Sequence, residues 1–291
     1  MINNLAYQQA MKAFIFPGQG AQFTGMGLDL YNSGEKARNL FSKADEVLGF
    51  PLSEIMFHGS EDELRQTRAT QPAVFVHSVI SALCSEDHGA DAVAGHSLGE
   101  FSALCYAGAL AWEDALRLVY ARALAMQRCC EKNPGAMAAI MGLEEETLAR
   151  VLNSHKNTAV IANHNCPGQL VISGSVEAIG KASEACRAAG AKKVVLLPVS
   201  GAFHSPLMQD AAEELAKAIE ATEFRVPRCP VYQNVDGAPH RDPAEIKENL
   251  LRQLTSPVLW TTTVRNMRAD GIDEFVEFGP GNVLSKLIRR I

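Results

Sequence analysis

The chain has 291 residues, 47% of them hydrophobic and 21% charged, with a formal net charge of −6. This composition is typical of a globular protein and argues against a disordered or fibrous chain, and the length allows one large domain or two modest ones. The acidic balance provides no overall basic field for nucleic acid or an anionic membrane, so we expect neither as a partner.

Hydrophobic segments, the N-terminal residues and the cysteine pattern indicate where in the cell the protein is expected. No apolar run reaches the roughly 20 residues needed to cross a bilayer. Residues 1–10 lack the basic start and apolar core of a secretory signal, so we interpret them as an N-terminal extension. The seven cysteines form no CxxC pair and no metal-type spacing, which favours free thiols in the cytoplasm. We expect a monomer without a metal or cofactor.

The first predicted unit is a strand, a loop and a helix. A short apolar run over residues 12–16 ends at Pro17-Gly18-Gln19-Gly20, and helical periodicity follows over about thirty residues. The loop lacks the third glycine of a dinucleotide fingerprint and the lysine of a phosphate loop. The backbone N–H of Gln19 is instead a candidate to lie beside a catalytic group. The alternative is a turn that only ends the strand.

A second unit repeats this pattern and contains a candidate nucleophile. Residues 71–84 have helical spacing, and an apolar strand over 91–95 leads into Ser97 and a helix over 98–107. Gly95-His96-Ser97-Leu98-Gly99 fits the GxSxG elbow, in which the serine occupies a sharp turn between strand and helix. The N–H of Leu98, at the helix start, would face developing negative charge. A tight glycine turn with a solvated serine is the alternative.

The next predicted helix, over residues 112–128, carries Arg122 within an apolar pattern. A guanidinium there needs an anionic partner, and a substrate carboxylate would match its two-pronged geometry. An exposed arginine whose stem covers apolar surface is the alternative, and the residues alone favour it.

The middle of the chain predicts a β-α-β-β-α-β series. The strands are expected over 136–141, 159–163, 169–173 and 193–197, and the helices over 144–152 and 176–189. This order is the ferredoxin-like pattern, and we expect it to form a small subdomain of residues 134–198. Elsewhere, alternating strands and helices predict an α/β fold with a parallel sheet covered on both faces.

The last third of the chain supplies a candidate base. Helices are expected over 206–221, 243–254 and 260–269, followed by a strand over 272–278 and a final helix. A catalytic serine needs a base, and His204 lies in a loop between two elements, where functional side chains are common. The other seven histidines lie mostly in helical or polar stretches.

Spaced motifs along nearly the whole chain after Met11 resemble those of malonyl-CoA:acyl carrier protein transacylases. They are Phe16-Pro17-Gly18-Gln19-Gly20, Gly95-His96-Ser97-Leu98-Gly99-Glu100, Arg122 with Met126-Gln127, Gly135-Ala136-Met137-Ala138-Ala139, Phe203-His204-Ser205, Gln253 and Glu277-Phe278-Gly279-Pro280-Gly281. The resemblance implies an α/β-hydrolase-like large subdomain, residues 11–133 and 199–291, and a ferredoxin-like small subdomain.

The resemblance also implies catalytic roles. Ser97 would attack the thioester of malonyl-CoA, His204 would move its proton, and the N–H groups of Gln19 and Leu98 would hold the oxyanion. The malonyl group would then pass to the phosphopantetheine thiol of holo acyl carrier protein.

The resemblance further implies residues that bind the substrate or orient the base. Arg122 would clamp the malonyl carboxylate, and a backbone carbonyl near Gln253, rather than a carboxylate, would orient the base. Phe203 would crowd an α-methyl group, and Asn163 and Asn165 fall where the family has polar residues near the cleft. His164, between them, departs from the family's usual choices.

Several alternatives share these residues. A serine hydrolase or thioesterase would pass the acyl group to water, and Arg122 with the missing triad acid argues against it. A carrier-binding scaffold with a vestigial site is disfavoured by the intact Ser97 and His204. A polyketide-pathway or malonate-specific acyltransferase would differ in its partner and not in its chemistry, so sequence leaves it open beside fatty acid synthesis.

Overall fold

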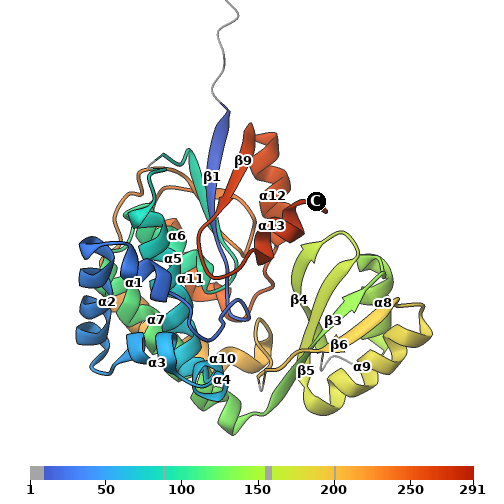
Figure 1. The fold of residues 1–291 in the computed structure, drawn as a ribbon. Coiled ribbons are helices and arrows are strands. Elements are labelled where there is room, and N and C mark those ends of the chain that lie inside the picture. Colours follow the sequence, from blue (N-terminus) through green and yellow to red (C-terminus); the bar gives the residue numbers. More distant parts are fainter. Residues whose placement is uncertain (1–9, 88, 155–158, 200) are drawn as a thin grey trace, which may run out of the picture.

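The computed structural model describes residues 10–87, 89–154, 159–199 and 201–291. Residues 1–9 of the expected N-terminal extension lie outside the described residues. The fold is mixed α/β with a parallel sheet and helices on both of its faces, as the alternating pattern predicts (Figure 1). Within the described ranges, no helix is both long and apolar enough to span a membrane.

The first sheet has five strands in the order β8-β7-β2-β1-β9. Its strands are β1 (Met11–Phe16), β2 (Ala92–Gly95), β7 (Val231–Tyr232), β8 (Pro239–His240) and β9 (Ile272–Glu277). All neighbours are parallel except β7 and β8. The two-residue strands β7 and β8 were not predicted, because so short a segment shows no alternating pattern.

Side chains of β1 enter two separate cores. Phe14 and Phe16 are fully buried in the larger core, and Ala13 and Ile15 are fully buried in a second core on the opposite face of the sheet. Successive side chains of a strand point to opposite faces, so a strand buried on both faces appears as an unbroken apolar run.

Helices cover both faces of this sheet. The side of the larger core has α1 (Leu28–Ser33), α2 (Glu35–Leu48), α3 (Leu52–His58), α4 (Glu61–Arg65), α5 (Thr67–Cys84), α6 (Gly99–Tyr106), α7 (Trp112–Lys132), α10 (Gln209–Ala221) and α11 (Pro243–Gln253). The other side has α12 (Trp260–Ala269) and α13 (Val283–Ile288). The helix predicted from Pro206 begins with one 3-10 turn over Pro206–Met208, η1, before α10.

The second sheet is built from consecutive elements and lies beside the first (Figure 1). They are β3 (Gly135–Met141), α8 (Glu145–Ser154), β4 (Ala159–Cys166), β5 (Gln169–Ser175), α9 (Val176–Ala188) and β6 (Lys193–Leu196). The strand order is β4-β5-β3-β6, with antiparallel pairs throughout.

The two faces of this second sheet have different neighbours. On one face Ile140 and Ile172 pack with Leu148 of α8 and Ile179 of α9. Alternate residues, such as Val171, point the other way and join the larger core. That second face is therefore turned toward the first sheet.

Hydrogen bonds also tie the second sheet to the segment that precedes α12. Val258 N–H donates to the Ala162 carbonyl at 2.8 Å, and His164 N–H donates to the Val258 carbonyl at 2.9 Å.

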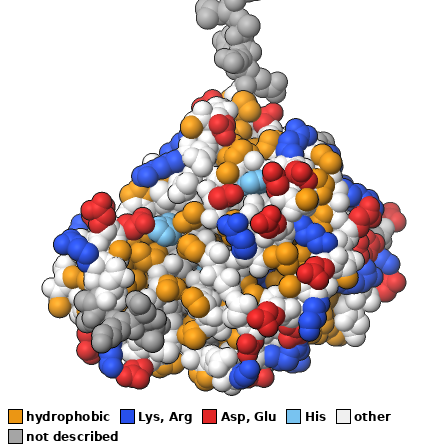
Figure 2. All heavy atoms as spheres, turned by 180° about the vertical axis from the view of Figure 1, so that it is seen from behind, with side chains coloured by type: hydrophobic (Ala, Val, Ile, Leu, Met, Phe, Trp, Pro, Cys, Tyr) orange, Lys and Arg blue, Asp and Glu red, His pale blue; other side chains and the backbone are white. Residues whose placement is uncertain are grey.

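On the face of the molecule shown in Figure 2, acidic and basic side chains are interspersed.

The segment after β2 lies tightly against the end of β1. A Cβ atom added to Gly99 would lie 2.0 Å from the carbonyl oxygen of Phe16, whereas one added to Gly180, exposed within α9, would meet no atom within 4 Å. The start of α6 can therefore approach β1 only because residue 99 has no side chain.

We expect Gly99→Ala to lower the free energy of unfolding by about 1–3 kcal/mol, because backbone must move to relieve the overlap. The matched control, Gly180→Ala, should raise it by about 0.5–1 kcal/mol through helix propensity. Chemical denaturation measures both. A Gly99→Ala protein with an unchanged midpoint would contradict the close approach.

Candidate active site

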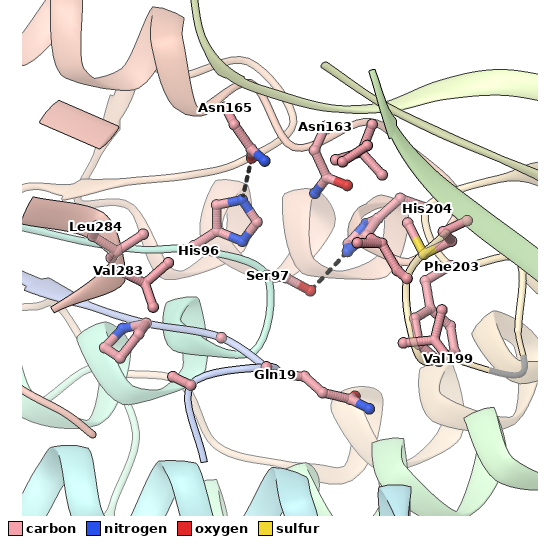
Figure 3. A pocket seen from close by; sticks show the side chains of 18 of the residues that line it. Gln19, His96, Ser97, Asn163, Asn165, Val199, Phe203, His204, Val283 and Leu284 are labelled. Atoms are coloured by element: carbon pink, nitrogen blue, oxygen red, sulfur yellow. Dashed lines mark hydrogen bonds between the residues drawn. The ribbon is translucent and has the colours of Figure 1, made fainter. Parts of the chain in front are cut away.

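Ser97 and His204 form a hydrogen-bonded pair. Ser97 Oγ lies 2.7 Å from His204 Nε2, although 107 positions separate the two residues (Figure 3). Ser97 follows β2 and His204 precedes η1. Their φ angles are +54° and +55°, and no other non-glycine residue of the described ranges has a positive φ. Strained backbone of this kind is concentrated at functional sites.

Backbone carbonyls determine which nitrogen of His204 carries the proton. Nδ1 lies 3.1 Å from the carbonyl oxygen of Gln253 and 3.1 Å from that of Ser256. A carbonyl can only accept, so Nδ1 carries the hydrogen and Nε2 keeps a lone pair for the Ser97 proton. In the described part of the chain no carboxylate contacts His204, and these carbonyls hold the ring instead.

A local turn holds the His204 loop. The Ser205 hydroxyl donates to the Ala202 carbonyl at 2.6 Å and accepts from the Leu207 N–H at 3.2 Å. These bonds form the start of η1 and fix the chain on both sides of the histidine. His204 itself is 4% exposed.

Burial lowers the pKa of His204 to about 3, and the positive charge of Arg122 adds to the effect. The imidazole is therefore neutral at pH 7, which is the form that a general base requires.

Arg122, on α7, is 1% exposed and has only neutral hydrogen-bond partners. Its Nη1 donates to Gln71 Oε1 at 2.8 Å, and its Nη2 donates to Ser97 Oγ at 3.0 Å and to Gln253 Oε1 at 3.4 Å. Among the described residues no carboxylate is paired with it.

The buried guanidinium keeps its charge. Burial lowers the pKa of Arg122 to about 10, and the charge of Glu100 acts in the opposite direction. A buried cation without a paired anion is costly. Arg122 therefore favours a ligand that brings an anion next to Ser97.

Two backbone N–H groups near Ser97 are available for an oxyanion. Neither Gln19 N–H nor Leu98 N–H has a hydrogen-bond partner among the residues described. Leu98 immediately precedes α6. The Gln19 loop lies against the elbow, because a Cβ on Gly18 would be 2.5 Å from the carbonyl oxygen of His96. Both N–H groups therefore belong to segments that adjoin Ser97.

Ser97 and His204 face a cavity of about 290 Å³ between the two sheets. One wall contains Gln19, His96, Ser97, Arg122, Phe203, His204, Val283, Leu284 and Leu287, and the facing wall contains Met137, Ala139, Asn163, Asn165, Gln169 and Val171. No cluster of metal-binding side chains occurs in the described ranges. The cavity is mostly apolar, with its polar groups gathered near Ser97.

The structure brings the predicted site residues together in two layers. Gln19, Arg122, Phe203, Asn163 and Asn165 line the cavity with Ser97 and His204. Gln253 is not among the lining residues described. It lies behind them, where its Nε2 donates to the Ser97 carbonyl at 3.1 Å and its own carbonyl faces His204. Its contacts are those of a residue that orients the pair.

Sequence reasoning missed several polar residues that the site uses. Gln71 holds Arg122, and His96 Nε2 lies 2.9 Å from Asn165 Oδ1. Asn234 accepts a hydrogen bond from the Ser97 N–H at 2.6 Å. The available signals were a glutamine inside the apolar helix over 71–84 and a polar pair directly after the apolar residues 230–232.

We expect the His204 imidazole to remain neutral from pH 8 to about pH 5, because burial moves its pKa far below the ordinary value of about 6.5. NMR titration of labelled histidines, with His204→Gln for assignment, measures this. Arg122→Ala should raise the His204 pKa. Half-protonation of wild-type His204 near pH 6.5 would contradict the neutral base.

The lowered pKa of His204 also makes folding stability depend on pH. Below about pH 6.5 the unfolded chain binds a proton at residue 204 that the folded chain excludes. This histidine therefore disfavours folding increasingly as the pH falls.

Comparisons with known proteins fit this geometry. Residues 13–290 match a family model described as acyl transferase domain. The chain is 42% identical over 284 residues to the malonyl CoA-acyl carrier protein transacylase of Bacillus subtilis, covering 96% of this chain and 90% of that protein.

Solved structures give the same result. An acyl carrier protein S-malonyltransferase from Vibrio cholerae superposes with a TM-score of 0.92 at 41% identity, covering 97% of this chain and 94% of that one. A malonyl-transacylase solved in complex with its type II PKS acyl-carrier protein has a TM-score of 0.93 at 40% identity, with coverages of 97% and 93%.

Proposed function

Because this chain belongs to the acyl transferase family of malonyl-CoA:acyl carrier protein transacylases, we propose that its cavity is where the malonyl group changes carrier. The chain is an acyltransferase that moves malonyl from malonyl-CoA to the phosphopantetheine thiol of acyl carrier protein. One observation supports the assignment of the site: Arg122 is buried, has no carboxylate partner among the described residues, and lies with its Nη2 3.0 Å from Ser97 Oγ. A malonyl thioester has its carboxylate one methylene from the carbonyl under attack. It can therefore place the carboxylate against Arg122 and the carbonyl against Ser97 Oγ.

In the first half-reaction Ser97 Oγ attacks the thioester carbonyl while His204 Nε2 accepts its proton. The N–H groups of Gln19 and Leu98 stabilise the oxyanion. The carbon–sulfur bond breaks, and His204 gives the proton to the departing CoA thiolate. A malonyl ester on Ser97 remains.

In the second half-reaction the carrier thiol loses its proton to His204 and attacks the ester. The bond between the acyl carbon and Ser97 Oγ breaks, and the proton returns to the serine. This two-step exchange gives ping-pong kinetics. A hydrolase would pass the acyl group to water with the same pair, but the transacylase relatives and the buried cation of Arg122 favour transfer.

The cavity walls suggest how the acyl group and its thioester arm are held. Arg122 binds the malonyl carboxylate, and Phe203 beside His204 leaves little room for an α-methyl group. Asn163 offers its amide to the thioester arm, because it has no side-chain hydrogen bond within the described residues. Asn165 already bonds His96.

We assign the two sheets to two subdomains. Residues 11–133 and 199–291 form the α/β-hydrolase-like part, and residues 134–198 form the ferredoxin-like part, which supplies the facing wall of the cavity. Every site residue named here comes from one chain, so we propose a monomer. The cysteine pattern supports a cytoplasmic location.

We propose that the malonyl group supplies fatty acid synthesis. A polyketide carrier is the second candidate, because the relative with a TM-score of 0.93 was solved with a type II PKS acyl-carrier protein. Both carriers would present the same thiol to Ser97.

Mixing the protein with malonyl-CoA should produce a single malonyl adduct, seen by intact-mass spectrometry, that disappears when holo acyl carrier protein is added. Ser97→Ala should abolish the adduct, since the ester oxygen is removed. An adduct that persists in Ser97→Ala, or none in the wild type, would refute the acyl-serine. Loss of the adduct without carrier would instead indicate hydrolysis.

We expect Arg122→Ala to reduce kcat/KM for malonyl-CoA by about 30-fold or more, the equivalent of about 2 kcal/mol for a lost buried charge pair. Transfer from acetyl-CoA, which lacks the carboxylate, should fall less. Arg128→Ala, an exposed position on the same helix, is the matched control. Steady-state kinetics with both donors measures this, and equal losses would contradict the carboxylate clamp.

A further inference from the structure

The side chain of Asn234 bridges the backbone on both sides of His96. Its Oδ1 accepts a hydrogen bond from the Ser97 N–H at 2.6 Å, and its Nδ2 donates to the Gly95 carbonyl at 2.6 Å. We call these two bonds the elbow clamp. Asn234 follows β7, which lies beside β2 in the sheet, so its side chain meets the turn from the side opposite β1.

The elbow clamp satisfies a backbone group that the sheet leaves unpaired. The ladder between β1 and β2 continues as far as the His96 N–H, which donates to the Phe16 carbonyl at 2.9 Å. At Ser97 the chain turns into the left-handed region, with φ of +54°, and its N–H leaves the ladder. A backbone N–H in a partly buried position still needs a partner, and Asn234 provides it.

Glu100 in turn holds Asn234. Its carboxylate, fully buried in the first turn of α6, accepts from the Asn234 N–H at 2.7 Å and from Gln233 Nε2 at 3.0 Å. The Glu100 N–H donates to the Ser97 carbonyl at 3.1 Å. The hydrogen bonds therefore form a closed ring from Ser97 through Glu100 and Asn234 back to Ser97.

We propose that Asn234, held by the carboxylate of Glu100, is a positioning residue that keeps Ser97 in its strained conformation and so aims Oγ at His204. A left-handed non-glycine residue persists only where its surroundings impose it. The direction of the Cα–Cβ bond depends on that backbone conformation. Without the elbow clamp the serine relaxes, and Oγ leaves the line to Nε2.

The positioning role of Asn234 rests on the proposed function of Ser97 as the nucleophile, and it predicts a specific kinetic effect. Asn234 has no hydrogen bond to Arg122 and is not among the described residues that line the cavity, so its loss should slow acylation by malonyl-CoA and acetyl-CoA equally. Reaction of Ser97 with a small sulfonyl fluoride, which needs no carboxylate site, should slow as well.

The test compares Asn234→Ala with Asn249→Ala. Asn249 is also a buried amide, and it donates to Gln233 Oε1 at 3.0 Å but lies outside the elbow clamp. Per folded molecule, Asn234→Ala should lower kcat about 10- to 100-fold, as a small misplacement of a nucleophile does. Its KM for malonyl-CoA and its malonyl-to-acetyl ratio should stay near wild type. Asn249→Ala should lose stability only.

A second variant keeps the proposal testable if Asn234→Ala does not fold. Glu100→Gln preserves the side-chain volume but places an amide where two donors converge. It should lower kcat by about threefold to tenfold, again with KM and the malonyl-to-acetyl ratio near wild type. Folded variants of both residues with wild-type kcat and sulfonylation rate would overturn the positioning role. So would a loss confined to malonyl transfer. Absence of the wild-type malonyl adduct would instead overturn the function of the site.

Discussion

The parallel strands of the five-stranded sheet all end at one edge, and the site depends on this common edge. β1 leads to Gln19, β2 to Ser97 and β7 to Asn234. Loops that follow parallel strands emerge on the same side, which is where ligands bind in open α/β sheets. Ser97 and Asn234, 137 positions apart, become hydrogen-bonded neighbours in this way. The second sheet closes the cavity from the opposite side, so Ser97 and His204 lie between residues of the two sheets.

Charge is arranged in the site so that His204 stays neutral and Arg122 stays positive. Burial and the nearby guanidinium of Arg122 both lower the pKa of His204. Amide oxygens and the Ser97 hydroxyl, rather than a carboxylate, accept the hydrogen bonds of Arg122. Burial raises the pKa of Glu100 to about 7, while donors from Asn234 and Gln233 favour its ionised form. The charge of Arg122 is the feature of the cavity that supports the proposed binding of a substrate carboxylate.

The long apolar runs and helices were predictable because burial imposes a period on the sequence. Residues 112–128 were expected to be helical, and α7 covers Trp112–Lys132. The strand expected over 136–141 is β3, Gly135–Met141. The short strand β7 was not predictable, because its two residues are a strand only through their pairing with β2. For the same reason the polar pair after residues 230–232 could not show which backbone groups Asn234 would bond.

The sequence by itself determined the mixed α/β fold and the candidate nucleophile, because a glycine-flanked serine between an apolar run and a helix can form only a sharp turn. It also offered His204 and Arg122 as candidates, with a family resemblance to connect them. Only the tertiary structure decided that His204 Nε2 meets Ser97 Oγ, that Arg122 is buried without a carboxylate, and that Asn234 holds the elbow. These contacts join residues from separate elements, so they exist only when the strands pair and the helices pack.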